Sequence, residues 1–247
     1  VGIAQQEGLL NINNKTSQYL GTGWTSLPLA KENLITVRHQ LTMTTGLDDG
    51  VPDVDCTLPS CMIYKADAGT RWAYHNAPYT ILDKVVETAS GQSYNAYFQV
   101  KIKDKIGMNG LWVPSGYNNV YYSTARSMAR FGLLMLNKGK WNTTSVLSDS
   151  NYFNAQVSSS QTLNNSYGYL TWLNGKSSHM LPGTQFIFNG KLILNAPDDM
   201  YAALGKNDQK MYVVPSQKLV VIRMGNDAGN VQLAVSSFDS ELWGKLK

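Results

Sequence analysis

The residues best suited to chemistry form the tripeptide Tyr74-His75-Asn76, which stands in a tight loop immediately before a predicted helix. A Tyr hydroxyl held beside a cation can lose its proton and serve as a general base. An Asn two residues later can orient a neighbouring Lys or a substrate amide. The same pattern also fits a structural Tyr followed by a capping Asn. The tripeptide therefore indicates acid–base chemistry only when its surroundings support that interpretation.

Aromatic and imidazole side chains supply the remaining candidates. His75 is central in the tripeptide and can approach a pocket, whereas Trp72 fits either a pocket wall or the core. His179 lies in a predicted loop and can line a substrate groove, although a loop His is usually solvated. His39 lies on a predicted helix and fits a buried, hydrogen-bonded imidazole. The three His lack metal-ligand spacing, so we expect neither a metal site nor a cofactor.

Amphipathic helices are expected to position the tripeptide. Apolar residues recur with helical spacing from Ala77 to Ser90, and Gly91 ends this pattern. Thr36 is a plausible N-cap for a shorter helix before the tripeptide. The predicted helices outside this segment cover residues 1–10, 36–43 and 123–137.

Strand patterns dominate the C-terminal part of the chain. Three apolar runs separated by short turns predict an antiparallel meander over Met200 to Leu204, Lys210 to Val214 and Leu219 to Met224. Val231 to Leu246 has the pattern of an amphipathic helix that can cover this sheet. We therefore predict an α/β fold of the α+β type. Residues 1–160 form a mainly helical lobe with the Tyr-x-Asn loop, and residues 161–247 form antiparallel strands with a covering helix.

Composition excludes several classes of function. The chain has 247 residues, of which 43% are hydrophobic and 15% are charged, which is enough apolar surface for a full-sized core. The net charge of +4 comes from scattered Lys and Arg rather than from a continuous basic surface, so no nucleic-acid partner is expected. No apolar run approaches the roughly 20 residues that span a bilayer, so we expect no transmembrane segment. Composition predicts no oligomeric state.

Two cysteines, Cys56 and Cys61, lie close together in a turn-rich stretch. A zinc site needs further Cys or His ligands nearby, and the sequence has none there. A small disulfide loop is the favoured interpretation, and two free thiols are the alternative. A disulfide indicates an oxidising, extracytoplasmic compartment, either periplasmic or secreted.

Four stretches, in this order along the chain, resemble the serine β-lactamase-like superfamily. This superfamily includes penicillin-binding proteins, class C β-lactamases, related esterases and 6-aminohexanoate-oligomer hydrolases. The stretches are Ile35 to Leu47, Trp72 to Asn76 running into Tyr79 to Gly91, Ser123 to Gly132, and the strand pair around Gly205 and Pro215. The resemblance implies a β-lactamase/transpeptidase-like fold and a small-molecule or peptide-like substrate.

The resemblance also implies a mechanism. A Ser-x-x-Lys pair at a helix start supplies a nucleophilic Ser and a Lys that shares its proton. Tyr74 would complete this network and protonate the leaving group, while Asn76 would hold the Lys or the substrate amide. A strand lines the other side of the site, and its best match is Ala203-Leu204-Gly205. The backbone N–H of Lys206 would then be one oxyanion-hole donor.

The sequence departs from the superfamily pattern at two points. No Ser or Thr is followed three residues later by Lys. The superfamily places that pair just before a helix end like Val1 to Gly8, so we expect the pair, with the N-terminal strands, before Val1. A catalytically inactive member that binds a peptide or cell-wall ligand is the alternative. Ala203 replaces a basic residue that would hold a substrate carboxylate, which favours an esterase or amide hydrolase.

Overall fold

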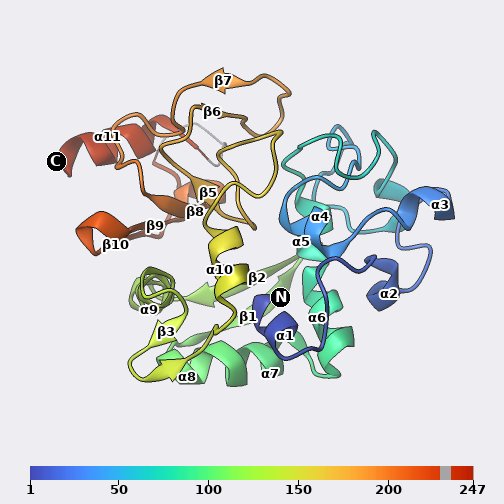
Figure 1. The fold of residues 1–247 in the computed structure, drawn as a ribbon, viewed down its shortest axis with the longest axis horizontal. Coiled ribbons are helices and arrows are strands. Elements are labelled where there is room, and N and C mark those ends of the chain that lie inside the picture. The colour runs from blue at the N-terminus through green and yellow to red at the C-terminus, as the bar shows by residue number, and fades with distance from the viewer. Residues whose placement is uncertain (229–234, 247) are drawn as a thin grey trace. The chain divides into compact units, whose positions relative to one another are not determined.

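The computed structural model describes residues 1–228 and 235–246, which form two compact units. The first unit consists of Val1–Asp104 and Gly110–Tyr122, and the second of Lys105–Asn109 and Ser123–Lys247. The division expected near residue 160 falls inside the second unit. Figure 1 shows the order of the elements along the chain. No helix in the described part of the chain combines the length and apolar character that crossing a membrane requires.

The first unit is mainly helical and has a single two-stranded hairpin among its described residues. Its core brings together apolar residues that are distant in sequence, namely Trp24, Ile35, Leu47, Met62, Ala77 and Ile81. Its elements are α1 (Gly2–Gln6), α2 (Ser17–Leu20), α3 (Leu29–Glu32), α4 (Val37–Leu41), η1 (Pro59–Cys61), α5 (Asn76–Thr80), α6 (Leu82–Ser90), α7 (Tyr94–Phe98), the π-helical η2 (Gln99–Lys103), β1 (Gly110–Ser115) and β2 (Asn118–Ser123). The short helix α8 (Asp104–Ile106) joins this unit to the next.

Helix α4 begins where the sequence predicts. Thr36 is its N-cap, and the Thr36 side chain accepts a hydrogen bond from the backbone N–H of His39. The imidazole Nδ1 of His39 accepts in return from the backbone N–H of Thr36, so the two residues form a capping box. His39 thus has the structural role expected of it.

The helix predicted over Ala77 to Ser90 is divided into α5 and α6 at Ile81. The buried side chain of Gln40 donates a hydrogen bond of 2.7 Å to the carbonyl of Pro78. In a continuous helix this carbonyl would accept from the N–H of residue 82. A side chain on α4 therefore occupies the acceptor at the break. Gly91, with φ of +66°, ends α6 as predicted.

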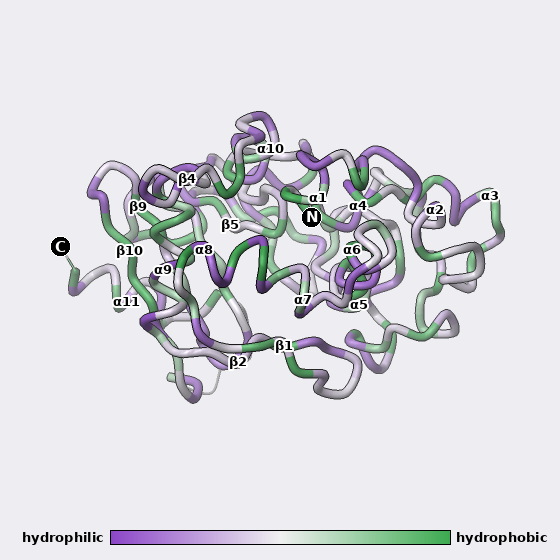
Figure 2. The backbone as a smooth tube through the Cα atoms, turned by 90° about the horizontal axis from the view of Figure 1, so that it is seen from below, coloured by the Kyte–Doolittle hydropathy of each residue, from purple (hydrophilic) through white to green (hydrophobic). Residues whose placement is uncertain are grey.

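The second unit contains a four-stranded antiparallel sheet in the order β10-β9-β8-β5. The predicted meander is therefore confirmed, and the short strand β5 adds to it. Residues along β9 and β10 are mostly hydrophobic, as Figure 2 shows. The elements are α9 (Ala125–Leu136), β3 (Lys140–Trp141), β4 (Thr144–Ser145), α10 (Ser150–Gln156), β5 (Trp172–Leu173), β6 (Ser178–His179), β7 (Phe188–Asn189), β8 (Tyr201–Leu204), η3 (Lys206–Asp208), β9 (Lys210–Val214), η4 (Pro215–Gln217), β10 (Leu219–Arg223) and α11 (Ser237–Lys245).

Helix α9 packs closely on β9 and β10. Gly132 permits this approach, because a Cβ atom at this position would lie 2.5 Å from a methyl group of Val220. The C-terminal helix α11 begins at Ser237, whereas the sequence predicts a start at Val231. Residues 231–234 of that prediction lie outside the described residues.

Candidate functional site

Tyr74 lies in the loop directly before α5, with its hydroxyl in desolvated surroundings. Burial raises the pKa of this hydroxyl well above its ordinary value, and the neighbouring Tyr79 adds to the effect. The two rings meet edge to face with their centroids 6.2 Å apart. A phenol in this environment keeps its proton unless a cation stabilises the phenolate. Acid–base chemistry at Tyr74 therefore requires a positive charge beside it.

Asn76 is the first residue of α5, and the N-cap position belongs to His75. The structure thus does not support the alternative of a capping Asn. The side-chain Nδ2 of Asn76 instead donates a hydrogen bond of 2.6 Å to Oδ1 of Asp55. Asp55 was not identified as a candidate from the sequence, although it directly precedes Cys56.

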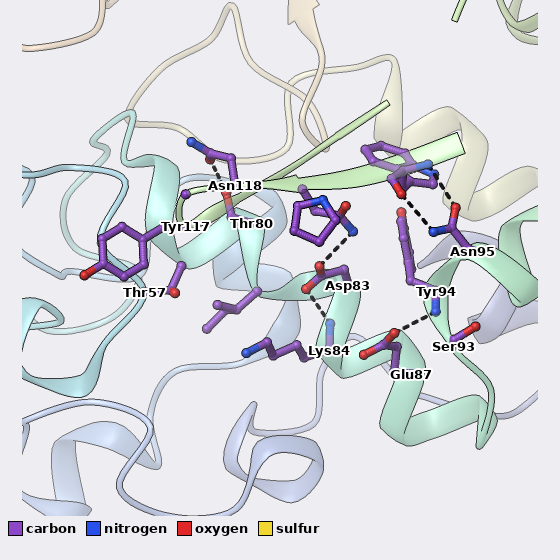
Figure 3. Close-up of a pocket in the computed structure, with 15 residues that line it drawn as sticks. Thr57, Thr80, Asp83, Lys84, Glu87, Ser93, Tyr94, Asn95, Tyr117 and Asn118 are labelled. Carbon is purple, nitrogen blue, oxygen red and sulfur yellow. Dashed lines mark hydrogen bonds between the residues drawn. The ribbon is translucent and has the colours of Figure 1, made fainter. Parts of the chain in front are cut away.

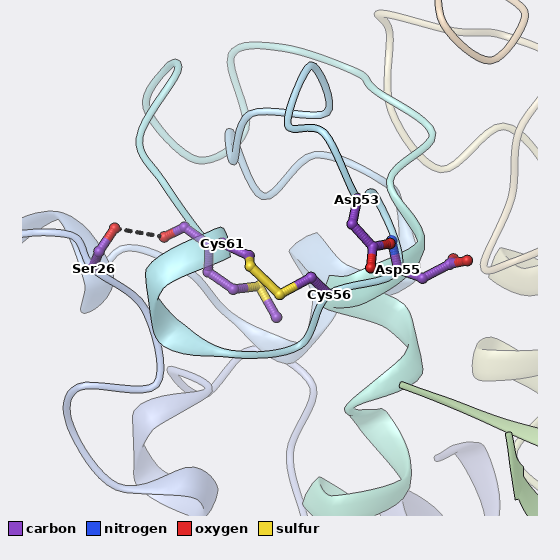
Figure 4. Close-up of a disulfide and its surroundings, with 6 residues drawn as sticks. Ser26, Asp53, Asp55, Cys56 and Cys61 are labelled. Carbon is purple, nitrogen blue, oxygen red and sulfur yellow. Dashed lines mark hydrogen bonds between the residues drawn. A yellow bond between two sulfur atoms is a disulfide. The ribbon is translucent and has the colours of Figure 1, made fainter. Parts of the chain in front are cut away.

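Asp55 directly precedes a small loop that is closed by a disulfide between Cys56 and Cys61, whose Cα atoms are 5.9 Å apart (Figure 4). The backbone N–H of Asp55 donates to Oδ1 of Asp53. One residue earlier, the carbonyl of Val54 accepts a hydrogen bond from the backbone N–H of Ala77 in α5. The segment that leads into this loop therefore contacts the start of α5 through both a side chain and the backbone.

His75 is buried, with only 2% of its surface exposed. Neither ring nitrogen has a hydrogen-bond partner among the described residues. Burial lowers the pKa of this imidazole, although the carboxylates of Asp49, Asp48 and Asp55 oppose the shift. Arg71, which forms a 2.6 Å ion pair with Asp49, lowers it further. His75 is thus a buried imidazole whose desolvated surroundings disfavour the protonated form.

Trp72 is 1% exposed and Trp172 is 2% exposed, so both indoles lie within the core of their respective units. This location agrees with the interpretation of Trp72 as a core residue. It leaves Trp72 little surface with which to line an open pocket.

The remaining candidates belong to the second unit. Ala203 is exposed on β8, between the buried residues Ala202 and Leu204. The N–H of Gly205 donates to the carbonyl of Gln209, which closes the turn after this strand, and Lys206 begins η3 within it. Tyr74 and Asn76, by contrast, lie in the first unit.

His179 lies on β6 in the second unit. Its Nδ1 is 3.0 Å from the carbonyl oxygen of Gly190. The ring stacks on Phe188, with centroids 5.4 Å apart and planes 15° apart. These contacts join β6 to β7, so His179 has a structural role in this hairpin.

A buried charged group fixes the turn that carries Gly205 and Lys206. Burial alone would raise the pKa of Asp208, but hydrogen bonds from Ala228, Ser236 and Lys210 outweigh burial and lower it. Asp208 has φ of +53°, a left-handed conformation that these three donors hold in place. The turn after β8 is therefore anchored both by Lys210 of β9 and by residues that follow β10.

The first unit also has a pocket of about 370 Å³ between α6 and the hairpin of β1 and β2 (Figure 3). Asp83 and Glu87 of α6 line one side, and the aromatic rings of Tyr94 and Trp112 meet edge to face beside them. Burial raises the pKa of Asp83, and the charge of Glu87 raises it further. None of the candidates predicted from the sequence lines this pocket. In the described part of the chain, no three His, Cys, Asp or Glu side chains cluster as metal ligands.

Comparison with known proteins identifies the fold. The model of the β-lactamase family matches residues 1–240. A proposed 6-aminohexanoate-dimer hydrolase from Bacillus anthracis is 19% identical with a TM-score of 0.71, and the alignment covers 98% of this chain and 67% of that protein. A proposed β-lactamase from Bacteroides dorei is 14% identical with a TM-score of 0.67, and the alignment covers 99% of this chain and 79% of that protein. A family VIII carboxylesterase is 14% identical with a TM-score of 0.65, and the alignment covers 94% of this chain and 75% of that protein. No curated protein matches the chain in sequence.

Proposed function

Since the chain belongs to the β-lactamase family, whose members are serine hydrolases, we propose that it acts on an ester or amide through an acyl-enzyme. The observation that carries this proposal is the tripeptide at the start of α5, where Tyr74 has a desolvated hydroxyl and Asn76 an amide held by hydrogen bonding. A low-dielectric environment strengthens the effect of any charge brought near that hydroxyl. A Lys ammonium beside Tyr74 would therefore lower the pKa that burial raises.

In the proposed reaction a Ser Oγ attacks the carbonyl carbon of the substrate. Its proton passes to the pair formed by Lys and Tyr74, because an unassisted serine hydroxyl is a weak nucleophile. The leaving alcohol or amine departs with a proton from Tyr74. Water then cleaves the acyl ester by the same proton route in reverse. The backbone N–H of Lys206 is proposed as one donor to the oxyanion, and the N–H of the nucleophile as the other.

The proposed reaction needs a nucleophile that these 247 residues do not supply as a Ser-x-x-Lys pair, because none of their Ser or Thr residues is followed three residues later by Lys. In the superfamily that pair precedes a helix like α1. The proposal is tested by determining the sequence that precedes Val1 in the source protein and by treating that protein with a fluorophosphonate probe. A Ser-x-x-Lys pair and covalent labelling of its Ser are expected. A protein without either would not be a serine hydrolase.

The proposed substrate is less anionic than a β-lactam or a D-Ala-D-Ala peptide. Ala203 is exposed on β8, where a basic residue would bind a substrate carboxylate. The folds that this chain resembles include those of a family VIII carboxylesterase and a proposed 6-aminohexanoate-dimer hydrolase. Parallel assays with a nitrophenyl ester and a chromogenic β-lactam distinguish the two classes, and faster turnover of the ester is expected.

The disulfide between Cys56 and Cys61 supports an extracytoplasmic location, because such bonds persist in oxidising compartments. A small-molecule or peptide-like substrate in the periplasm or outside the cell is therefore proposed. Fractionation of the source cells tests the location.

A second candidate is a non-catalytic protein that keeps the fold and binds a peptide or cell-wall ligand. The absence of a Ser-x-x-Lys pair from these 247 residues favours it. This candidate predicts saturable ligand binding without covalent labelling by a serine probe.

A further inference from the structure

We propose that Asp55 is a positioning residue that orients Asn76 so that its side-chain oxygen faces the catalytic Lys. This inference rests on the proposed function, since it assigns a task within the same site. Neither the sequence pattern nor the family match assigns any role to Asp55.

The chemistry of the pair determines the orientation of the amide. An ionised carboxylate can only accept hydrogen bonds, so the group of Asn76 that faces Asp55 must be the Nδ2 amine. The 2.6 Å bond is in the range of charge-assisted hydrogen bonds. The oxygen of the amide then points away from Asp55. Among the residues that the structure describes, the Asn76 side chain bonds to Asp55 through Nδ2, and no group donates to its Oδ1. This oxygen is therefore available to accept from an ammonium group.

The loop that carries Asp55 is tied to the fold at both ends. On one side, Val54 accepts from the N–H of Ala77, which docks the loop on α5. On the other side, the disulfide links Cys56 to Cys61. Met62, which follows Cys61, is fully buried in the core. The carbonyl of Met62 accepts from both the N–H and the hydroxyl of Ser26. Asp55 is thus held between two anchored points, as a residue that orients another side chain must be (Figure 4).

The orientation of the amide also distinguishes the two roles expected of Asn76, which are to hold the Lys or to hold the substrate amide. An amide whose oxygen is free and whose nitrogen already donates to Asp55 is better suited to hold a Lys ammonium than to donate to a substrate carbonyl. An Asn that holds Lys acts on the chemical step rather than on substrate binding. Loss of the orientation should therefore lower kcat and leave KM unchanged.

The first experiment compares Asp55→Ala with Asp55→Asn in the source protein. The Asn variant keeps an oxygen that can accept from Asn76, whereas the Ala variant does not. Asp55→Ala should lower kcat for a nitrophenyl ester by about 10- to 100-fold, the effect of losing one charge-assisted hydrogen bond, with KM within about twofold. Asp55→Asn should recover most of the lost rate. Equal losses in both variants would mean that the charge of Asp55 matters rather than its bond to Asn76, and would overturn the proposal.

Asp67→Ala is the matched control. Asp67 is also a loop Asp of the first unit, and its carboxylate is paired with Lys31 on the surface. This variant should keep the wild-type kcat and KM. A similar loss of rate in Asp67→Ala would attribute the effect to general destabilisation of the unit and would overturn the proposal.

The second experiment tests whether the disulfide acts through Asp55. The double substitution Cys56→Ser with Cys61→Ser should lower kcat in the wild-type background. In the Asp55→Ala background it should cause little further loss, because two changes that remove the same contact are not additive. Multiplicative losses would show that the disulfide and Asp55 act independently, and would contradict the positioning role of the loop.

A third measurement separates this inference from the proposed function. The side-chain ¹⁵N resonance of Asn76 should shift on Asp55→Ala and remain near its wild-type position on Asp55→Asn. An unchanged resonance in Asp55→Ala would overturn the inference even if the wild-type protein is labelled by the serine probe. A wild-type protein that is not labelled at all would overturn the proposed function itself and, with it, the role of Asn76 toward Lys.

Discussion

The ammonium of Lys210 lies 3.2 Å from a carboxylate oxygen of Asp239, and the two side chains are 0% and 1% exposed. This contact joins β9 to α11. The hydroxyl of Tyr212 donates to the other oxygen of the same carboxylate, and the capping box of Ser236 and Asp239 begins the helix. One carboxylate therefore caps α11 and also fastens it to the sheet.

Asp239→Ala should destabilise the second unit strongly. The substitution removes one of the two carboxylates that pair with the buried Lys210 ammonium, the other being that of Asp208. Loss of one partner from a buried ion pair typically costs about 3–5 kcal/mol of unfolding free energy. Urea denaturation followed by Trp fluorescence measures the change. Glu241→Ala, at an exposed position on the same helix, is the control and should change the stability by less than about 0.5 kcal/mol.

Substitution of His75 should change how stability depends on pH. Because burial lowers the pKa of His75 below the ordinary value of about 6.5, the native state binds fewer protons than the unfolded state in mildly acidic solution. The unfolding free energy should therefore fall as the pH drops below about 6.5, and should stop falling below the native pKa. His39 contributes in the same direction, since burial lowers its pKa as well.

His75→Leu should reduce this pH dependence and raise stability at neutral pH by about 1 kcal/mol. The variant removes two ring nitrogens that have no partner among the described residues, and a buried unpaired polar group is costly. Urea midpoints measured between pH 5 and 8 test both effects. The control is Gln92→Leu, which introduces the same side chain at an exposed position of the first unit without removing an imidazole. This account would be contradicted if the unfolding free energy of His75→Leu depended on pH as steeply as that of the wild type.

Contacts within one element could be predicted from the sequence, whereas contacts between distant segments could not. The meander and α9 follow from apolar residues with the spacing of strands and helices. The break between α5 and α6 depends on Gln40, which is 38 residues away from Pro78 in the chain. The bond from Asn76 to Asp55 joins positions 21 residues apart. No local pattern contains such pairings, because each depends on how separate segments pack.

The hairpin of β1 and β2 differs from these contacts, because the sequence contains the local pattern of a hairpin. Gly116 has φ of +59°, as a tight turn between two strands requires. The strands bring Trp112 and Tyr121 together with ring centroids 5.2 Å apart. Aromatic residues on either side of a Gly-containing turn are typical of a hairpin, so this element could have been predicted. It forms one wall of the pocket beside α6.

Gln40→Leu tests the contact that divides the predicted helix. The Gln40 side chain accepts from the hydroxyl of Thr16 at 2.8 Å and donates to the carbonyl of Pro78. Leu fills a similar volume but leaves both groups buried without this partner, at a cost of about 1–3 kcal/mol each. A loss of about 2–6 kcal/mol of unfolding free energy is expected from thermal or urea unfolding. Gln92→Leu at an exposed position is the control, and an equal loss there would show that the contacts of Gln40 are not the cause.

Tyr74→Phe tests the proposed base without removing its ring. The substitution deletes only the hydroxyl, so the aromatic contact with Tyr79 remains. General acid–base catalysis typically contributes about 100- to 10,000-fold, and covalent labelling by a fluorophosphonate should slow by a factor in this range. The matched control is Tyr79→Phe, because burial also raises the pKa of Tyr79, to about 12, and the ring lies beside Tyr74. Labelling should stay near the wild-type rate in the control. Equal rates for Tyr74→Phe and the wild type would exclude Tyr74 as the base, since its hydroxyl would then take no part in activating the nucleophile.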